Sequence, residues 1–219
     1  LKQIAPTLSG ERAAYMADLL NEICPKYGID TLDEFHEFLA NVVQESGEFS
    51  HKVENMNYSS QRMAVIWKDR YGIPIYSIDP KTKKQKIIGY SPNQKALSLH
   101  RKPVELSNDV YGGRMGNNQP NDGFDFRGGG FIGLTGREVY TKYGNYIGKD
   151  PVLAAQLVRG EDYYALDSAA WFFSVLKGLN DEAERDEWRK VVRSINGGFI
   201  GLDVRTKYYE RIKRVLPIP

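Results

Sequence analysis

The spacing of apolar residues predicts an amphipathic helix over residues 32–46. Within residues 35–43, phenylalanine, leucine and valine recur at i, i+3, i+4, i+7 and i+8, which is one face of an α-helix. Thr31 with Glu34 three residues later has the form of a capping box at the helix start. Gly47 stands where a left-handed glycine commonly ends a helix.

The remaining pattern is also mostly helical, with one exception. Further helices are expected over 9–24, from Ser59 to Trp67, and over 93–101, 103–111, 136–144, 161–177, 181–194 and 203–215. Residues 71–90 instead contain two β-prone runs around a lysine-rich turn, which predicts a hairpin with a basic tip. We interpret that tip as a solvated loop, and contact with an anionic polymer is the alternative. Residues 112–130 form a long Gly- and Asn-rich loop, of a kind that is usually functional or disordered.

Composition narrows the class of protein. The 219 residues are 41% hydrophobic and 26% charged, as in soluble globular proteins of one domain or of two lobes. No apolar run approaches the ~18–20 residues of a membrane span, and no secretory signal is visible. The net charge of +2 is too small to indicate nucleic-acid binding. We therefore expect no nucleic-acid partner and no stable membrane insertion.

Cysteine and histidine usage excludes other kinds of site. Cys24 is the single cysteine, so an intramolecular disulfide is excluded, and its place in the first helix predicts a buried apolar role. The three histidines have no metal-ligand spacing. We predict no metal and no cofactor.

Glu45 is the first candidate for chemistry. It falls in the last turn of the 32–46 helix, at the edge of the apolar face. The negative end of the helix dipole and an apolar neighbourhood both raise the pKa of a carboxyl group, as a general acid requires. An ordinary exposed glutamate in a fraying turn is the alternative, and the helix pattern alone favours that alternative.

Two more segments suggest a partner for Glu45. Glu54 follows nine residues later, beyond a glycine turn, and an inverting glycosidase needs two carboxyl groups ~6.5–9.5 Å apart. Residues 126–136 are glycine-rich and end near Thr135, which predicts a cleft floor with a hydroxyl facing substrate or water. A phosphate cradle is disfavoured, because the Gly-Lys-Ser/Thr ending and the strand–helix context are both missing. Asn196 lies in an Asn-Gly turn after another helical segment.

Taken in order, these segments resemble glycoside hydrolase family 19, most closely its phage endolysin branch. The likeness spans roughly residues 30–215. It rests on Asn41-Val42-Val43-Gln44-Glu45-Ser46-Gly47, Val53-Glu54-Asn55-Met56-Asn57-Tyr58-Ser59, Tyr111-Gly112-Gly113-Arg114-Met115-Gly116-Asn117, Phe126-Arg127-Gly128-Gly129-Gly130, Gly133-Leu134-Thr135-Gly136-Arg137, Ile195-Asn196-Gly197-Gly198 and Gly201-Leu202-Asp203-Val204-Arg205. The resemblance implies a mainly α, lysozyme-like two-lobed helical domain with a small β-hairpin. It further implies that residues 1–219 are one catalytic domain, with the hairpin insert at about 71–91 and no separate wall-binding domain.

The resemblance also implies site roles. Glu45 would be the general acid and Glu54 the general base, with Thr135 helping to hold the attacking water. Tyr58 and Asn196 would contact substrate. Arg205 would lie near the catalytic acid, where its charge would lower the pKa of Glu45.

The chain departs from the family pattern at three positions. Gln44 stands in place of a histidine, Glu48 in place of a second glycine, and Gly133 in place of a glutamine whose amide would reach substrate or water. The last change weakens the expectation of chitin as substrate.

By this resemblance we expect a monomeric peptidoglycan hydrolase that cleaves β-1,4 glycosidic bonds with inversion. Such an endolysin would be made in the host bacterial cytoplasm and reach the cell wall at lysis with help from a holin-type protein. A chitinase of the same family is one alternative. A non-catalytic glycan-binding or phage structural module is the other, and it has no need for two carboxylates so placed.

Overall fold

In a computed structural model that describes residues 1–217, the chain forms two compact units. One contains residues 1–54 and the described residues from Phe126 onward, and the other contains residues 55–125. The first unit is helical. Its elements are α1 (Gly10–Ile23), the 3-10 turn η1 (Cys24–Tyr27), α2 (Leu32–Glu45), α8 (Arg137–Ile147), α9 (Pro151–Gly160), α10 (Asp162–Trp171), the π-helical turn η2 (Phe172–Leu176), α11 (Asn180–Glu184), α12 (Trp188–Asn196) and α13 (Leu202–Val215).

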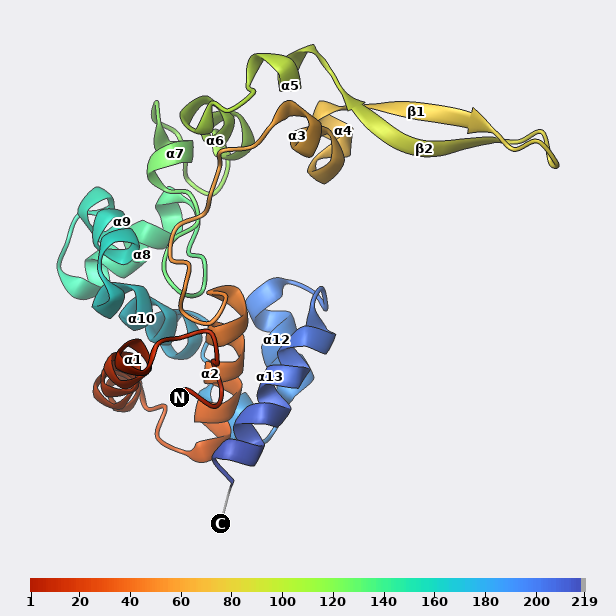
Figure 1. The fold of residues 1–219 in the computed structure, drawn as a ribbon. Coiled ribbons are helices and arrows are strands. Elements are labelled where there is room, and N and C mark those ends of the chain that lie inside the picture. The colour runs from red at the N-terminus through yellow and green to blue at the C-terminus, as the bar shows by residue number, and fades with distance from the viewer. Residues whose placement is uncertain (218–219) are drawn as a thin grey trace. The chain divides into compact units, whose positions relative to one another are not determined.

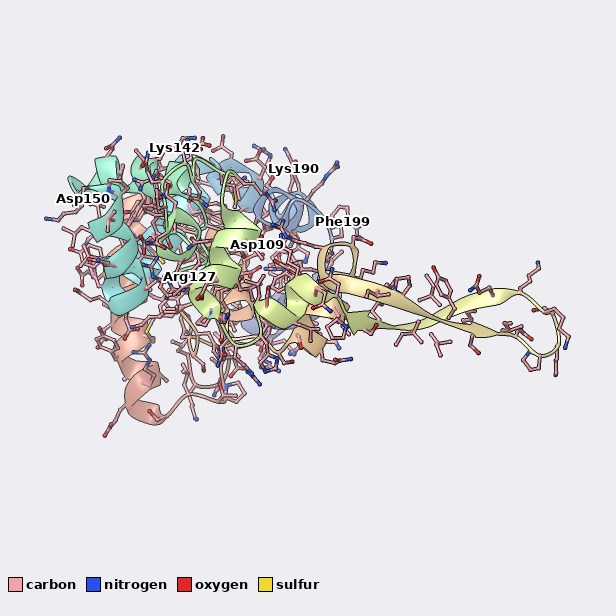
Figure 2. The ribbon with its side chains drawn as sticks, turned by 90° about the horizontal axis from the view of Figure 1, so that it is seen from above. Asp109, Arg127, Lys142, Asp150, Lys190 and Phe199 are labelled. Atoms are coloured by element: carbon pink, nitrogen blue, oxygen red, sulfur yellow. The ribbon has the colours of Figure 1, made fainter. Side chains whose placement is uncertain are left out.

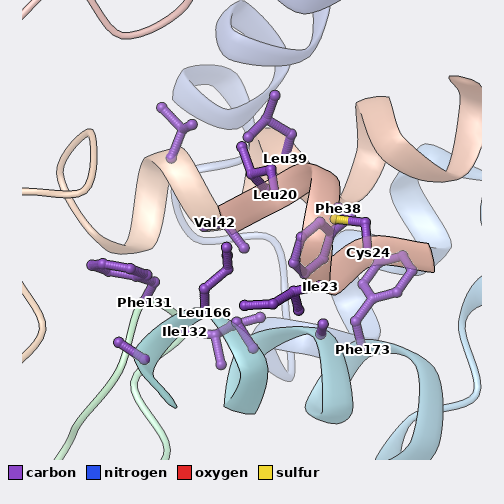
Figure 3. Packing of buried hydrophobic residues seen from close by; sticks show 14 of the residues in the cluster. Leu20, Ile23, Cys24, Phe38, Leu39, Val42, Phe131, Ile132, Leu166 and Phe173 are labelled. Atoms are coloured by element: carbon purple, nitrogen blue, oxygen red, sulfur yellow. The ribbon is translucent and has the colours of Figure 1, made fainter. Parts of the chain in front are cut away.

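Helix α2 lies at the centre of this unit. It begins with the predicted capping box between Thr31 and Glu34, and Gly47 follows its end in the left-handed conformation. Helix α13 runs alongside α2 (Figure 1). The apolar face of α2 packs into the main core, where Phe38 meets the edge of Phe173 at 5.4 Å between ring centroids (Figure 3). The C-terminal end of α2 is thereby fixed by the packing of its whole length.

The second unit contains the hairpin. Its elements are α3 (Ser60–Ile66), α4 (Lys68–Tyr71), β1 (Gly72–Ile78), β2 (Gln85–Pro92), α5 (Gln94–Ser98), α6 (Pro103–Tyr111) and α7 (Asp122–Asp125). A small core of its own forms around Met56, Met63, Tyr71 and Leu106. The strands pair antiparallel, as the sequence predicted, with an irregularity in register between Ile75 and Tyr76.

Three predictions of local structure need correction. Helix α9 was not expected, although Asp150 caps it by accepting from the backbone N–H groups of Val152 and Leu153, and Pro151 opens it. The helix expected over 181–194 is two helices, α11 and α12, interrupted around Asp186, whose φ is 57°. The loop expected over 112–130 contains the short helix α7.

Two further observations concern the class of protein. Cys24 is buried as predicted, and burial raises the pKa of its thiol to about 12, so the thiol stays protonated near neutral pH. Within residues 1–217, no helix combines the length and apolar character needed to cross a bilayer.

Candidate active site

Glu45 is the last residue of α2, and its carboxylate is held by Arg205. The guanidinium, in the first turn of α13, donates to Glu45 Oε1. It also donates to Asn41 Oδ1 at 3.0 Å and to Asn196 Oδ1 at 2.8 Å. The Arg205 side chain is 6% exposed and that of Glu45 is 29% exposed, so the ion pair lies where the core meets solvent. A rigid guanidinium fork thus fixes the Glu45 carboxylate relative to three helices.

The two asparagines are themselves oriented. Asn41 is fully buried, and its Nδ2 donates to the backbone carbonyl of Glu37 at 2.8 Å, which leaves Oδ1 facing Arg205. Asn196 donates to the backbone carbonyl of Ile200 at 3.4 Å. Sequence reasoning gave Asn41 no role. The sequence did contain a signal, because the Asn41 amide lies next to the apolar stripe of α2. A polar group buried there needs hydrogen-bond partners.

Behind Glu45 the chain reverses in an unusual turn. Gly47, Glu48 and Phe49 are consecutive left-handed residues, with φ of 55°, 58° and 59°. For a residue other than glycine this conformation costs on the order of 1 kcal/mol or more. The side-chain hydroxyl of Ser46 donates to the Val42 carbonyl at 2.7 Å and accepts from the Phe49 N–H at 2.8 Å, which closes the turn.

Glu48, one of the departures from the family pattern, anchors this turn. The backbone N–H and the hydroxyl of Thr7 both donate to its Oε2, and the Tyr208 hydroxyl donates to Oε1 at 3.0 Å. Burial by itself would raise the pKa of Glu48, but these hydrogen bonds and the charge of Arg211 lower it on balance. The Glu48 carboxylate therefore ties the N-terminal segment and α13 to the turn that follows Glu45.

Glu54 lies on the segment that pairs with the glycine-rich stretch. The backbone N–H of Glu54 donates to the Gly128 carbonyl at 2.9 Å, and the N–H of Gly130 donates to the Lys52 carbonyl at 3.0 Å. The N–H of Gly128 then donates to Glu54 Oε2 at 3.0 Å. A backbone N–H therefore helps to position the Glu54 carboxylate.

Thr135, like Glu54, lies beside Gly128. A Cβ atom at Gly128 would be 3.2 Å from Glu54 Oε2 and 3.5 Å from Thr135 Oγ1. The Thr135 hydroxyl donates to the Gly133 carbonyl at 2.9 Å, which leaves its oxygen able to accept. Glycine is needed nearby for packing too, since a Cβ atom at Gly129 would be 2.5 Å from the Tyr140 hydroxyl.

The six predicted site residues thus fall into three groups. Glu45, Arg205 and Asn196 form one hydrogen-bonded cluster, and Glu54 and Thr135 both lie beside Gly128. Tyr58 belongs to the second compact unit, where its ring meets the edge of Trp67 at 5.2 Å. Its assignment to substrate stays a prediction.

Comparison with known proteins identifies the family. No family model matches the chain. A Haemophilus influenzae protein described as "Glycosyl hydrolase family 19 domain-containing protein" is 30% identical over 177 residues, which cover 80% of this chain and 76% of the relative.

Solved structures share the fold. A bacterial family 19 chitinase aligns with a TM-score of 0.60 at 17% identity, over 100% of this chain and 93% of its own. Chitinase C from Streptomyces griseus HUT6037 aligns with a TM-score of 0.59 at 16% identity, over 98% of this chain and 74% of its own. The class IV chitinase of Zea mays aligns with a TM-score of 0.53 at 15% identity, over 100% of this chain and 87% of its own. At these identities the structures establish the fold alone, which confirms the predicted mainly α, lysozyme-like architecture, and the sequence relative establishes the family. The chain belongs to glycosyl hydrolase family 19.

Proposed function

We propose that this glycoside hydrolase cleaves β-1,4 bonds of peptidoglycan glycan strands by single displacement with inversion. One observation carries the mechanism: two carboxylates of the same compact unit are each held by a hydrogen bond. Glu45 accepts from the Arg205 guanidinium, and Glu54 accepts from the backbone N–H of Gly128, beside the Thr135 hydroxyl. Two carboxylates in different surroundings suit an acid and a base with separate tasks.

In the proposed reaction Glu45 gives its proton to the glycosidic oxygen as the bond from that oxygen to the anomeric carbon breaks. The carboxylate that remains is the form that Arg205 stabilises. A water molecule donates one hydrogen to Glu54 and the other to the Thr135 oxygen, so that a lone pair is free for the anomeric carbon. Glu54 takes the first of these protons as the new bond forms.

Space beside Thr135 supports peptidoglycan as the substrate. Gly133 replaces the family's glutamine, and apart from its two chain neighbours no described residue has an atom within 4 Å of where a Gly133 Cβ would lie. Muramic acid carries a lactyl-peptide branch that chitin lacks, and an open position can admit it. The resemblance to the endolysin branch points the same way. Chitin is the rival substrate, because the solved structures with this fold are described as chitinases.

Site variants test the mechanism. Glu45→Gln and Glu54→Gln should each lower kcat on purified peptidoglycan by about 10²-fold or more, because each removes a proton-transfer group. Glu210→Gln, an exposed position of α13, is the matched control and should keep full activity. Circular dichroism checks that all variants fold. Near-wild-type activity of Glu45→Gln would overturn the assignment of the acid.

Substrate assays test specificity separately. Turbidity loss of peptidoglycan and reducing-end release from chitin oligomers should be compared at equal enzyme concentration. We expect efficient turnover of peptidoglycan and weak turnover of chitin. The reverse ratio would make the protein a chitinase, and turnover of neither would favour a non-catalytic glycan-binding module.

We also propose a role in lysis from within a bacterial cell. The basis is the endolysin likeness alone. Expression in the bacterial cytoplasm should leave cells intact until a holin-type protein permeabilises the membrane. Lysis at the same rate without that protein would contradict this dependence.

A further inference from the structure

The hairpin of the second unit extends beyond the helices that anchor it. Strands β1 and β2 contact α3, α4 and α5 near their base (Figure 1). Beyond that base, residues 75–78 and 85–88 are exposed throughout, and side chains project from both sides of the ribbon (Figure 2). A two-stranded hairpin without a covering layer is at most marginally stable in water. Its exposed surface therefore calls for a function.

Large apolar side chains contribute to that surface. Six large side chains of the hairpin are each at least 43% exposed, namely Ile73, Ile75, Tyr76, Ile78, Ile87 and Ile88. Tyr76 pairs with Ile87, and the register irregularity leaves Ile88 as an extra residue beside them. Strands normally bury such residues on one face, and grouped exposed apolar side chains mark an interaction surface.

The same hairpin has a net positive charge. Lys81, Lys83, Lys84 and Lys86 are all exposed, and none forms an ion pair with a described residue. With Asp79, they give residues 72–92 a net charge of +3, whereas the whole chain carries +2. The excess positive charge is thus concentrated at the hairpin, next to the apolar side chains.

We propose that this hairpin binds the surface of a bilayer rich in anionic lipids. Isoleucine and tyrosine side chains enter the boundary between headgroups and acyl chains, and the lysines pair with anionic headgroups. A soluble polyanion would use the lysines but leave the isoleucines without a partner. A second copy of the chain would bring two +3 hairpins together, which charge repulsion opposes. The binding is peripheral and reversible.

Co-sedimentation of the full chain with vesicles tests this proposal. Vesicles of phosphatidylcholine with 30 mol% phosphatidylglycerol should bind the protein, and pure phosphatidylcholine should bind it weakly. Lys83→Gln with Lys84→Gln should weaken binding about 30-fold, given about fivefold for each lysine near an anionic surface. Ile78→Ser with Ile88→Ser should weaken it about tenfold or more, because apolar area is lost from the buried surface.

Matched variants separate the hairpin from a general effect. Lys149→Gln with Lys207→Gln removes the same charge at exposed positions outside the hairpin, and Leu97→Ser removes an exposed apolar side chain of α5. Both should keep wild-type binding, and circular dichroism should show every variant folded. Equal binding to both vesicle types, or binding that survives both hairpin variants, would overturn the proposal. The wild type could instead self-associate at the assay concentration, and the Ile78→Ser, Ile88→Ser variant could abolish that self-association. This result would overturn the proposal and make a second copy of the chain the partner of the hairpin.

Discussion

A buried carboxyl group beneath the site gives a quantitative prediction of pH dependence. Glu37 lies on α2, and its backbone carbonyl accepts the Asn41 amide that helps to orient Arg205. Its side chain is fully buried, and within residues 1–217 neither carboxyl oxygen has a hydrogen-bond partner. Burial above all, together with the charges of Asp186, Asp33 and Glu187, raises the pKa of Glu37 to about 8, and Lys213 opposes the rise.

The sign of the effect follows from proton binding. An unfolded glutamate titrates near 4.5, so between 4.5 and about 8 the folded chain holds a proton that the unfolded chain has lost. The free energy of unfolding should therefore fall as pH rises through this window. A difference of roughly 3.5 pH units corresponds to at most ~5 kcal/mol, and relaxation around the carboxylate reduces this to about 2–4 kcal/mol.

Urea denaturation at pH 5 and pH 8.5 measures this difference. Glu37→Gln removes the titration while keeping the size of the side chain. Between the two pH values its free energy of unfolding should therefore fall by about 2–4 kcal/mol less than that of the wild type. Glu11→Gln, an exposed position in the first turn of α1, should behave as the wild type. An equal fall in the wild type and in Glu37→Gln would refute the reasoning.

Three further variants test the supports of the two carboxylates. Arg205→Lys keeps the charge but removes the guanidinium fork that reaches Glu45 and two asparagines. We therefore expect kcat to fall by about tenfold or more and the free energy of unfolding to fall by about 2–4 kcal/mol. Gly128→Ala should press on the Glu54 carboxylate and lower kcat roughly tenfold with a change in stability below about 1 kcal/mol. Glu48→Gln should lower stability by about 1–3 kcal/mol, because charge-assisted hydrogen bonds are lost.

Each of these variants has an outcome that would count against its reasoning. For Arg205→Lys it is unchanged kcat, since a point charge would then suffice. For Gly128→Ala it is an unchanged kcat in a folded protein, which would mean that kcat does not depend on the position of the Glu54 carboxylate. For Glu48→Gln it is wild-type thermal unfolding, which would mean that the left-handed turn holds without the carboxylate.

The sequence was most informative where local rules and packing agree. Helix α2 could be predicted because its apolar period, its capping box and Gly47 all act within a few residues. Its last residue, Glu45, could therefore be placed at a helix end. Helix α9 was missed although Asp150 and Pro151 mark its start, because its apolar pattern alone was not recognised.

Contacts across long sequence separations could not be read in the same way. Arg205 and Asn41 are 164 positions apart, and no local pattern brings a guanidinium to that amide. Glu48 looked like a departure from a glycine, and only the structure places Thr7 and Tyr208 around its carboxylate. The family resemblance supplied a place for Arg205 but no partner for Asn41 or Glu48.

Mass spectrometry of the soluble products from purified peptidoglycan tests the central claim most directly. The wild type should release disaccharide-peptides with a new reducing sugar end, and the mass of that end names the bond cleaved. Glu45→Gln should release none above background. Products that are peptides without sugar, or the same disaccharide-peptides from Glu45→Gln, would contradict the assignment of Glu45 as the acid of a peptidoglycan glycosidase.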